Sequence, residues 1–481
     1  MRRIFRLYPR FFTQLLKIIF GTILVLLPAC TATPTPSAPT PEIFPTSAGE
    51  PTPFVSPTPT EGSASPTPAG EPVSSLGVEP DQLNGVTVEF WHGFSGARAA
   101  LLSEWAEAFN ASNSFGISIA LTAKDDIFNV VQEAIRTNAS PDLTMGFTYQ
   151  AAGWDQAALP RASLVDLTPF LTDPVYGFTS EEVADFYPAF LQQETVDGRL
   201  LGLPAYRSAE VMLYNVRWAQ ELGFQTSPTT PDEFKQQACA AAQTRGDGKG
   251  GWFLSTDTAT TLGWIYAFGG NIVSDGAYQF NTPETTAAFR FIREMGEGGC
   301  AWTPEAEFPN VEFAAREGLF YATSLSGLAF QQQAFADAGN ADTWTIIPFP
   351  TPYGAASTYV FGPAYNVLAT TPEKEVAAWL FVQWASAPER QVRWTEVGGS
   401  FPVRGATIGL LSAYVAGMPQ WTRAYDLVPQ GKGEPALPSW GTVQWVVGDA
   451  AAQLFSFGFT AEQIPSVVET LEQTANELGG Q

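Results

Sequence analysis

Histidine is nearly absent from this sequence of 481 residues, in which His92 is the only one. One imidazole cannot build a zinc site from several histidines or a multi-histidine catalytic site, although a triad with a single histidine stays open. The sequence also contains no G-x-S-x-G, H-E-x-x-H or C-x-x-C motif. "DGKGG" at 247–251 lacks the further acids of a calcium loop, so a glycine turn is expected. We therefore expect no metal site and no cofactor.

Basic residues are scarce as well. The chain has 24 Lys and Arg against 48 Asp and Glu, and five of the basic residues lie within the first 17 positions. The remainder therefore carries 19 basic and 48 acidic residues, a net charge of −29. This excess argues against nucleic acid as a partner and against docking on anionic lipid by charge. It does not exclude a neutral ligand, because a binding cleft can differ from the overall surface.

Long apolar runs are confined to the N-terminus. A basic segment precedes an apolar run at 18–27, which is as long as the core of a signal peptide and too short to span a bilayer. The run ends in "LLPAC", which resembles a bacterial lipobox in which Cys30 is acylated. We expect a signal peptide over 1–29 and an exported, lipid-anchored protein. An uncleaved anchor or an ordinary secretory signal is the alternative.

The segment after Cys30 has the composition of a disordered tether. Residues 31–80 contain 13 prolines, together with Thr, Ser, Ala and Gly, and no Lys or Arg lies between 31 and 84. Such a segment cannot bury enough apolar surface to fold. We expect a stalk over 30–84 that holds a folded part away from the membrane.

Only two cysteines remain after Cys30, namely Cys239 and Cys300. In an exported protein two leftover cysteines are expected to form a disulfide, and two separate buried thiols are the alternative. In the chain-entropy model a bridge closing a loop of that length stabilises the fold by roughly 4 kcal/mol.

The rest of the chain alternates strands and helices. Val86, Val88 and Phe90 alternate with polar residues, which predicts a strand, and apolar residues at three- and four-residue spacing over 101–109 predict a helix. Strands are predicted at 117–121 and 141–147, with a helix at 127–136 between them. This order predicts a mostly parallel α/β sheet whose ligand loops follow the carboxyl ends of the strands. About 400 residues exceed one core, so two lobes are expected.

The strand and helix pattern restarts after Gly198. "GGWFLS", "TWTIIPFP" and "TYVFGPAYNVLAT" are strand-like. "TDTATTLGWIYAFGG", "PEKEVAAWLFVQWAS" and "TAEQIPSVVETLEQTANEL" are helix-like, with Pro or Thr at the start or Gly at the end. The break marks the boundary between the two expected lobes.

Several of these segments together resemble a known family. The lipobox, the stalk, "VEFWHGFSGARAALLSEWAEAFN", "PDLTMGF", "LLGLPAYRSAEVMLYNVRWAQELG" and "EPALPSWGTVQWVVGDAAAQLF" look like an extracellular solute-binding protein of an ABC importer. The nearest likeness is to the family 1 carbohydrate-type receptors, which include maltose- and glycerol-phosphate-binding proteins. The resemblance covers roughly residues 85–478.

The resemblance implies a two-lobed periplasmic-binding-protein-like fold of type II, with mixed, mostly parallel sheets and a hinge between the lobes. Lobe 1 is placed at 85–210 and 362–405, and lobe 2 at 211–361 and 406–481. Crossings are expected near 208–213, 359–365 and 404–410. The implied protein is a monomer without catalysis, which captures a sugar, oligosaccharide or glycerol phosphate and delivers it to ABC-importer permease subunits.

Candidate ligand contacts follow from the chemistry of sugar binding, which uses flat aromatic faces and planar hydrogen-bonding groups. Near the first and third strands the candidates are Trp91, His92, Ser95 and Tyr149. For Trp91 the alternative is a core position, for His92 a structural hydrogen bond, and for Tyr149 a surface position. Tyr206 is expected to stack on the ligand and Arg207 to donate to it, unless Arg207 forms a structural pair with Glu210.

The remaining candidates lie further along the chain. Trp264 shares one helical face with Phe268, a pattern that is also typical of a core. Ser324 and Ser326 occupy a strand-to-helix turn suited to binding hydroxyls, and a simple serine turn is the alternative. Further candidates stand at the second crossing and beyond, namely Tyr365, Arg404 and Trp440.

Two competing functions stay open. An exported glycoside hydrolase needs two carboxylates. With 48 acidic residues in the chain, some pair of carboxylates will always fit this requirement, so the signal for a hydrolase is weak. A sensor module that presents its ligand to a membrane partner without transport would have the same cleft.

Overall fold

The structure, a computed structural model, describes residues 72–354 and 358–480. The expected signal peptide, Cys30 and most of the stalk lie outside these residues. Residues 74–84, assigned to the stalk by composition, are instead packed on the first lobe, so this boundary prediction was wrong. Val78 and Leu83 are buried, and the backbone and hydroxyl of Ser75 bind the carboxylate of Asp173. Scattered apolar residues in a proline-rich segment gave too weak a signal for this docking.

One sheet organises the first lobe and has the order β2-β1-β3-β15-β6. The neighbours β2, β1 and β3 are parallel, whereas β15 pairs antiparallel with β3 and β6. The exposure of β1 alternates along the strand, as its apolar pattern predicts. The five strands are β1 (Thr87–His92), β2 (Ser118–Ala123), β3 (Leu143–Gly146), β6 (Leu203–Pro204) and β15 (Ala364–Val367).

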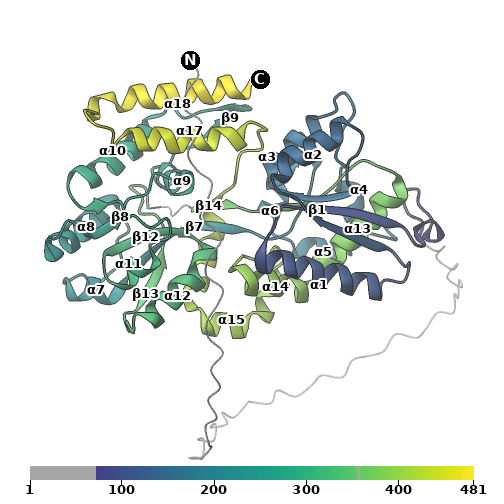
Figure 1. The fold of residues 1–481 in the computed structure, drawn as a ribbon, viewed down its shortest axis with the longest axis horizontal. Coiled ribbons are helices and arrows are strands. Elements are labelled where there is room, and N and C mark those ends of the chain that lie inside the picture. Colours follow the sequence, from purple (N-terminus) through teal and green to yellow (C-terminus); the bar gives the residue numbers. More distant parts are fainter. Residues whose placement is uncertain (1–71, 355–357, 481) are drawn as a thin grey trace, which may run out of the picture. The chain divides into compact units, whose positions relative to one another are not determined.

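Helices flank this sheet, with α1 and α13 grouped on one side in Figure 1 and α2 and α3 on the other. The predicted helix at 127–136 is found with the same bounds. The elements are η1 (Pro80–Leu83), α1 (Gly96–Ser112), α2 (Ile127–Arg136), α3 (Thr148–Gln156), α4 (Thr168–Leu171), α5 (Ser180–Asp185), α6 (Pro188–Gln193), α13 (Pro372–Ala385) and α14 (Pro388–Gly398), with a small hairpin of β4 (Thr195–Val196) and β5 (Arg199–Leu200).

A second sheet organises the other lobe and has the order β11-β8-β12-β7-β14-β16, with β13 also paired to β7. The neighbours β11, β8 and β12 are parallel, and β7 runs antiparallel to β12, β13 and β14. The strands are β7 (Ser208–Asn215), β8 (Gly250–Phe253), β11 (Ala301–Trp302), β12 (Gly318–Ser324), β13 (Trp344–Ile347), β14 (Thr358–Phe361) and β16 (Gly431–Lys432).

The helices of this lobe include α17 and α18, which lie side by side along its edge (Figure 1). They are α7 (Val216–Glu221), α8 (Pro231–Arg245), α9 (Thr258–Ala267), α10 (Pro283–Glu297), α11 (Asn310–Ala314), η2 (Leu325–Gly327), α12 (Leu328–Asp337), α15 (Ser412–Gly417), α16 (Pro419–Tyr425), η4 (Val428–Gln430), α17 (Trp440–Gln453), η5 (Ala461–Gln463) and α18 (Ile464–Gly479), with a hairpin of β9 (Val273–Ser274) and β10 (Ala277–Tyr278). The short helix η3 (Gly405–Leu410) instead packs on α14 of the first lobe.

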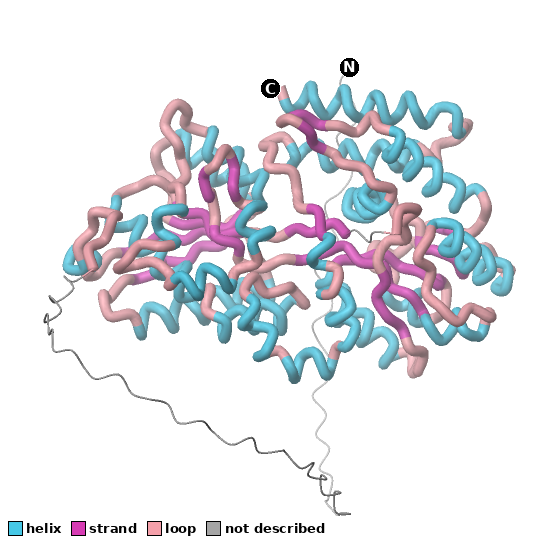
Figure 2. Tube along the Cα trace, turned by 180° about the vertical axis from the view of Figure 1, so that it is seen from behind, coloured by secondary structure: helices cyan, strands magenta, loops and turns pink. Residues whose placement is uncertain are grey.

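Two strands carry the chain between the lobes, and we call β7 and β14 the crossing strands; the chain crosses once more after α14, on its way to α15 and α16. The crossing strands pair with each other through Ala209 and Val360, next to the point where each chain enters the first lobe. Both lie in the middle of the molecule in Figure 1, and Figure 2 shows strands running through this region from the opposite side. The lobes are therefore joined by hydrogen-bonded extended chain.

The predicted disulfide between Cys239 and Cys300 is confirmed. It ties α8 to the residue before β11, where the backbone packs closely against β8. A Cβ at Gly251 would lie 1.8 Å from the carbonyl oxygen of Cys300, so only glycine fits there.

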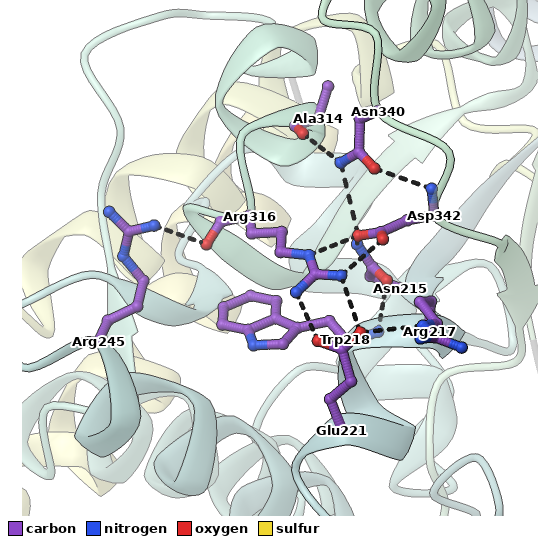
Figure 3. A network of polar contacts seen from close by, with 9 residues as sticks. All are labelled: Asn215, Arg217, Trp218, Glu221, Arg245, Ala314, Arg316, Asn340 and Asp342. Carbon is purple, nitrogen blue, oxygen red and sulfur yellow. Dashed lines mark hydrogen bonds and ion pairs between the residues drawn. The ribbon is translucent and has the colours of Figure 1, made fainter.

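A polar network fixes the end of the second sheet that is remote from the first lobe (Figure 3). Arg316 has a left-handed backbone, with φ of 57°, and its guanidinium binds Asp342 through two nitrogens at 2.6 Å. It also binds Glu221 at 2.6 Å, and its carbonyl accepts from Arg245 at 2.9 Å. Asn215 adds a bond to Asp342 at 2.8 Å. The network thus ties together the ends of α7 and α8 and the starts of β12 and β13.

Candidate functional site

A cavity of about 450 Å³ opens at the carboxyl ends of the parallel strands β8, β11 and β12. Open α/β sheets bind ligands at this end, because the loops that follow parallel strands meet there. The loop 254–257 after β8 forms one wall, and the loop 303–309 after β11 forms another. Glu210 on the crossing strand β7 closes the side toward the first lobe, since it pairs with Ser324 at the end of β12.

Two carboxyl groups meet in the cavity around one hydroxyl. Thr260 Oγ1 lies 3.0 Å from Glu210 Oε1 and 2.8 Å from Asp257 Oδ2. Asp257 is also the N-cap of α9, because its Oδ1 accepts from the backbone of Thr260 at 2.9 Å. Glu210 is buried, and this burial, together with the charge of Asp257, raises its pKa well above the ordinary value.

The rest of the wall combines aromatic rings with hydroxyl groups. Phe253 and Tyr321 pack edge to face and are buried, whereas Phe308 at the mouth is 67% exposed. The serine and threonine residues of the wall are Ser255, Thr256, Thr303, Thr323 and Ser324. Among the described residues that line the cavity, none is Lys, Arg or His. An aromatic face beside hydroxyls and carboxyls suits a small polyhydroxylated ligand.

The structure buries His92 beneath the start of α1. The side chain is 2% exposed, and its Nδ1 accepts a hydrogen bond from the backbone of Phe94 at 3.1 Å. Burial lowers its pKa, so the ring is neutral near pH 7. This geometry corresponds to the structural hydrogen bonder, which was the alternative to a ligand contact. The neighbouring Trp91 keeps some exposed surface, and Lys124 Nζ lies 4.3 Å from its ring centre.

Ser95 and Tyr149 stay candidate contacts on the first lobe. Ser95 is exposed at the start of α1. Tyr149 on α3 is 9% exposed, and burial raises its pKa to about 12. A Cβ at Gly441 on α17 would lie 3.0 Å from the Tyr149 ring, so this tyrosine sits where the two lobes approach each other.

Arg207 is fully buried and joins the two crossing strands at the ends that adjoin the first lobe. Its Nη1 donates to the carbonyl oxygens of Tyr206 at 3.0 Å and of Gly362 and Pro363 at 3.2 Å each. Its charged partner is Glu194 rather than Glu210. The predicted donor to a ligand is therefore occupied by protein groups.

Tyr206 packs between protein groups as well. The ring is 5% exposed, lies 4.9 Å from that of Trp394, and has the Arg98 guanidinium 5.1 Å from its centre. Burial raises the pKa of Tyr206 to about 12. A ligand can stack on it only if Arg98 moves.

Four further candidates have structural contacts in place of an open face. Trp264, Tyr365 and Trp440 have no exposed surface, and Trp264 is enclosed by Phe and Trp rings of the lobe 2 core. Arg404 is 5% exposed, and its Nε donates to Asp185 at 2.8 Å. Their assignment as ligand contacts rests on the sequence prediction alone.

Of the predicted contacts, Ser324 is the one that the structure places in the cavity wall, and Ser326 accompanies it at 2.8 Å between the two hydroxyl oxygens. Sequence reasoning missed Asp257, Phe308 and Tyr321, and it considered Glu210 only as a partner of Arg207. A usable signal existed for Asp257, since it follows a buried strand and precedes a helix as an N-cap.

A family model described as "bacterial extracellular solute-binding protein" matches residues 104–407. A probable ABC transporter-binding protein of Deinococcus radiodurans is 24% identical over 325 residues, which cover 64% of this chain and 76% of that protein.

Solved structures share the fold at low identity. The sugar-binding protein MalE of Xanthomonas citri has a TM-score of 0.71 at 20% identity and covers 82% of this chain and 98% of its own. The cyclic alpha-maltosyl-1,6-maltose binding protein of Arthrobacter globiformis has a TM-score of 0.68 at 19% identity, with coverages of 82% and 99%. UgpB of Mycobacterium tuberculosis, in complex with glycerophosphocholine, has a TM-score of 0.65 at 18% identity and covers 81% of this chain and 98% of its own. The predicted two-lobed α/β fold is confirmed.

Proposed function

Because the chain belongs to the bacterial extracellular solute-binding protein family, we propose that it captures a sugar or a related polyhydroxylated solute and delivers it to the permease subunits of an ABC importer. The observation that carries this proposal is the cavity at the carboxyl ends of β8, β11 and β12, which adjoins the crossing strands. Its carboxyl groups, hydroxyls and the exposed ring of Phe308 match the two faces of a pyranose.

Solute capture works through closure of the two lobes. The crossing strands β7 and β14 are short and paired, so small backbone changes near them rotate one lobe against the other. The solute is bound first by the lobe 2 cavity and then covered by groups of the first lobe, among them Trp91, Ser95 and Tyr149. The closed form is the one that docks on the permease, because a partner that binds one state selects it from the equilibrium.

The protein acts outside the cell on a lipid anchor. The lipobox-like "LLPAC" and the proline-rich segment after it support this location. Among the described residues, no helix has the length and apolar character needed to cross a membrane. Growth with a clickable fatty acid tests the anchor, since wild-type protein should become labelled and Cys30→Ala should not. Unlabelled wild-type protein would contradict the anchor.

A thermal-shift screen tests the function. The panel holds mono-, di- and oligosaccharides, amino sugars and glycerol phosphates, each at millimolar concentration. A true ligand at about 100 times its Kd adds roughly 2.7 kcal/mol to the free energy of unfolding and should raise Tm by a few degrees. No shift with any member of the panel would contradict the proposal. We expect no turnover, and release of product from a glycoside would favour a hydrolase instead.

A further inference from the structure

The two carboxyl groups at the cavity, those of Glu210 and Asp257, share the hydroxyl of Thr260 as a hydrogen-bond partner. The hydroxyl of Thr260 has a single hydrogen, yet it lies within hydrogen-bond distance of both Glu210 Oε1 and Asp257 Oδ2. Asp257 also accepts from Ser255 and from the backbone of Thr260, so it is supplied with donors. The arrangement is consistent when Thr260 donates to Asp257 and Glu210 itself carries a proton and donates to Thr260.

Burial and charge favour the same assignment. Glu210 is 4% exposed, and desolvation followed by the charge of Asp257 raises its pKa well above the ordinary value. Among the described residues, no hydrogen-bond partner is found for its second carboxyl oxygen, and Glu210 belongs to the cavity wall. The buried acid therefore has hydrogen-bonding capacity left for a bound molecule.

Among the described residues that line the cavity around this pair, none carries a positive charge. Glu307 from the loop before α11 and Tyr321 from β12 line the same cavity, and the charge of Glu312 on α11 acts on Tyr321. Burial raises the pKa of Tyr321 to about 12, so it is neutral at physiological pH. A negative group placed in this cavity meets only acids and neutral groups, whereas a positive group is attracted by all of the acids.

The wall also suits the rest of such a molecule. The ring of Phe308 is 67% exposed at the mouth and offers a face to C–H groups or to a cation. Thr303 and Ser324 place hydroxyls around the same space. The cavity thus combines one anionic pole with surfaces for a hydroxylated carbon frame.

We propose that this cavity selects solutes in which a polyhydroxylated frame carries a primary ammonium group, such as amino sugars, over their neutral and phosphorylated counterparts. The inference rests on the proposed function and narrows its class of solute. The ammonium group donates to Asp257 and Glu210 and keeps its own protons. Glu210 then ionises, and its carboxyl proton leaves to the solvent, so binding releases one proton.

Isothermal titration with matched ligands tests this inference. The panel pairs glucosamine and galactosamine, and the glucosamine dimers with α-1,4 and β-1,4 links, with their N-acetyl and hydroxyl analogues and with glucose 6-phosphate. The amine should bind at least about tenfold more tightly than its N-acetyl analogue, as expected for a charge-assisted contact. Titration near pH 6.5 in buffers of different ionisation enthalpy should show release of close to one proton for the amine and none for the neutral analogue.

Two isosteric variants locate the effect. Asp257→Asn keeps an N-cap acceptor for α9 and removes the charge, so it should lower the ratio of amine to N-acetyl affinity about tenfold or more. Glu210→Gln should abolish proton release. Asp337→Asn, at an exposed position on α12 of the same lobe, should leave the ratio as it is in the wild type. The wild-type comparison decides the question even where a variant fails to fold.

The outcomes separate this inference from the proposed function. If neutral sugars bind as tightly as the amines, or the phosphate binds most tightly, the selectivity for amines is overturned and solute binding stands. If amines bind without release of a proton, the shared-proton arrangement is overturned. If no polyhydroxylated solute of the panel binds, the proposed function falls together with the inference.

Discussion

Arg207 and Glu194 form an ion pair in which neither side chain has exposed surface. Glu194 also accepts from Thr148 at 3.2 Å, and Arg207 donates to three carbonyl oxygens at the ends of the two crossing strands. A pair placed there joins the first lobe to both crossing strands at once. The pair fixes the position about which the lobes turn. Removing it should therefore lower the free energy of unfolding of the whole protein.

Removal of one partner of this pair should therefore destabilise the protein strongly. Arg207→Ala leaves Glu194 buried without its counter-charge, which costs about 3–5 kcal/mol in the free energy of unfolding. Arg217→Ala is the matched control, because Arg217 pairs with Glu221 at the surface with 60% of its side chain exposed. For this control we expect the free energy of unfolding to fall by less than about 1 kcal/mol. Urea unfolding measures both, and similar losses would contradict the clamp.

Glu434 should make stability depend on pH. Its side chain is half-buried, but its Oε2 is buried without a hydrogen-bond partner among the described residues, and Tyr359 donates to its Oε1 at 3.3 Å. Burial, followed by the nearby charge of Glu194, raises the pKa of Glu434 from 4.5 to about 8. The folded state then holds a proton that the unfolded state has released. Glu434 therefore makes its full contribution to the free energy of unfolding below about pH 4.5. This contribution falls by roughly 1.4 kcal/mol per pH unit as the pH rises toward 8.

The variant Glu434→Gln should flatten this dependence, because the amide does not titrate. Its stability relative to wild type should increase steadily from pH 5 to pH 8 and level off above, as measured by urea unfolding at each pH. Glu477→Gln, at an exposed position on α18, serves as the control with a wild-type profile. Parallel profiles for wild type and Glu434→Gln would show that Glu434 is ionised in the folded state.

The disulfide between Cys239 and Cys300 should account for a measurable part of the stability. Replacing both cysteines by alanine should lower the free energy of unfolding by roughly 4 kcal/mol in the chain-entropy model. Addition of a reductant should lower the Tm of the wild type and leave that of the double variant unchanged. A reductant effect of equal size on both proteins would assign the loss to something other than this bridge.

His92 should matter for stability. His92→Ala removes a buried acceptor and leaves the backbone N–H of Phe94 without its partner, which costs about 1–3 kcal/mol. His92→Asn retains an acceptor near the position of Nδ1 and should restore part of the loss. Thermal unfolding measures both. A normal Tm for His92→Ala together with weakened solute binding would show that His92 is a ligand contact and not a structural residue.

The fold was largely predictable because its signals are local. The alternating exposure of β1 and the bounds of α2 follow from periodicity in short windows of sequence. The division into lobes followed from the length and from the restart of the pattern after Gly198. The disulfide needed only the count of cysteines and the export signal. None of these steps depends on knowing which distant residues meet.

The candidate site was less predictable because it depends on distant contacts. Arg207 had an acid three positions away at Glu210, yet it pairs with Glu194 across a turn of the first lobe. Trp264 and Trp440 have the residue type of a sugar platform but lie in a core rich in other aromatic rings, which sequence cannot rank by exposure. The rule that ligand loops follow strand ends was applied to the first lobe, and its use on β8 would have identified Asp257.

In the proposed function, the two lobes close over a solute held in the lobe 2 cavity. Small-angle X-ray scattering of residues 70–481, which form one compact unit, measures this closure with and without the strongest solute of the thermal-shift screen. We predict a smaller radius of gyration at saturating solute, with the wild-type value of the free protein recovered after dialysis. Unchanged dimensions at saturation would contradict the account.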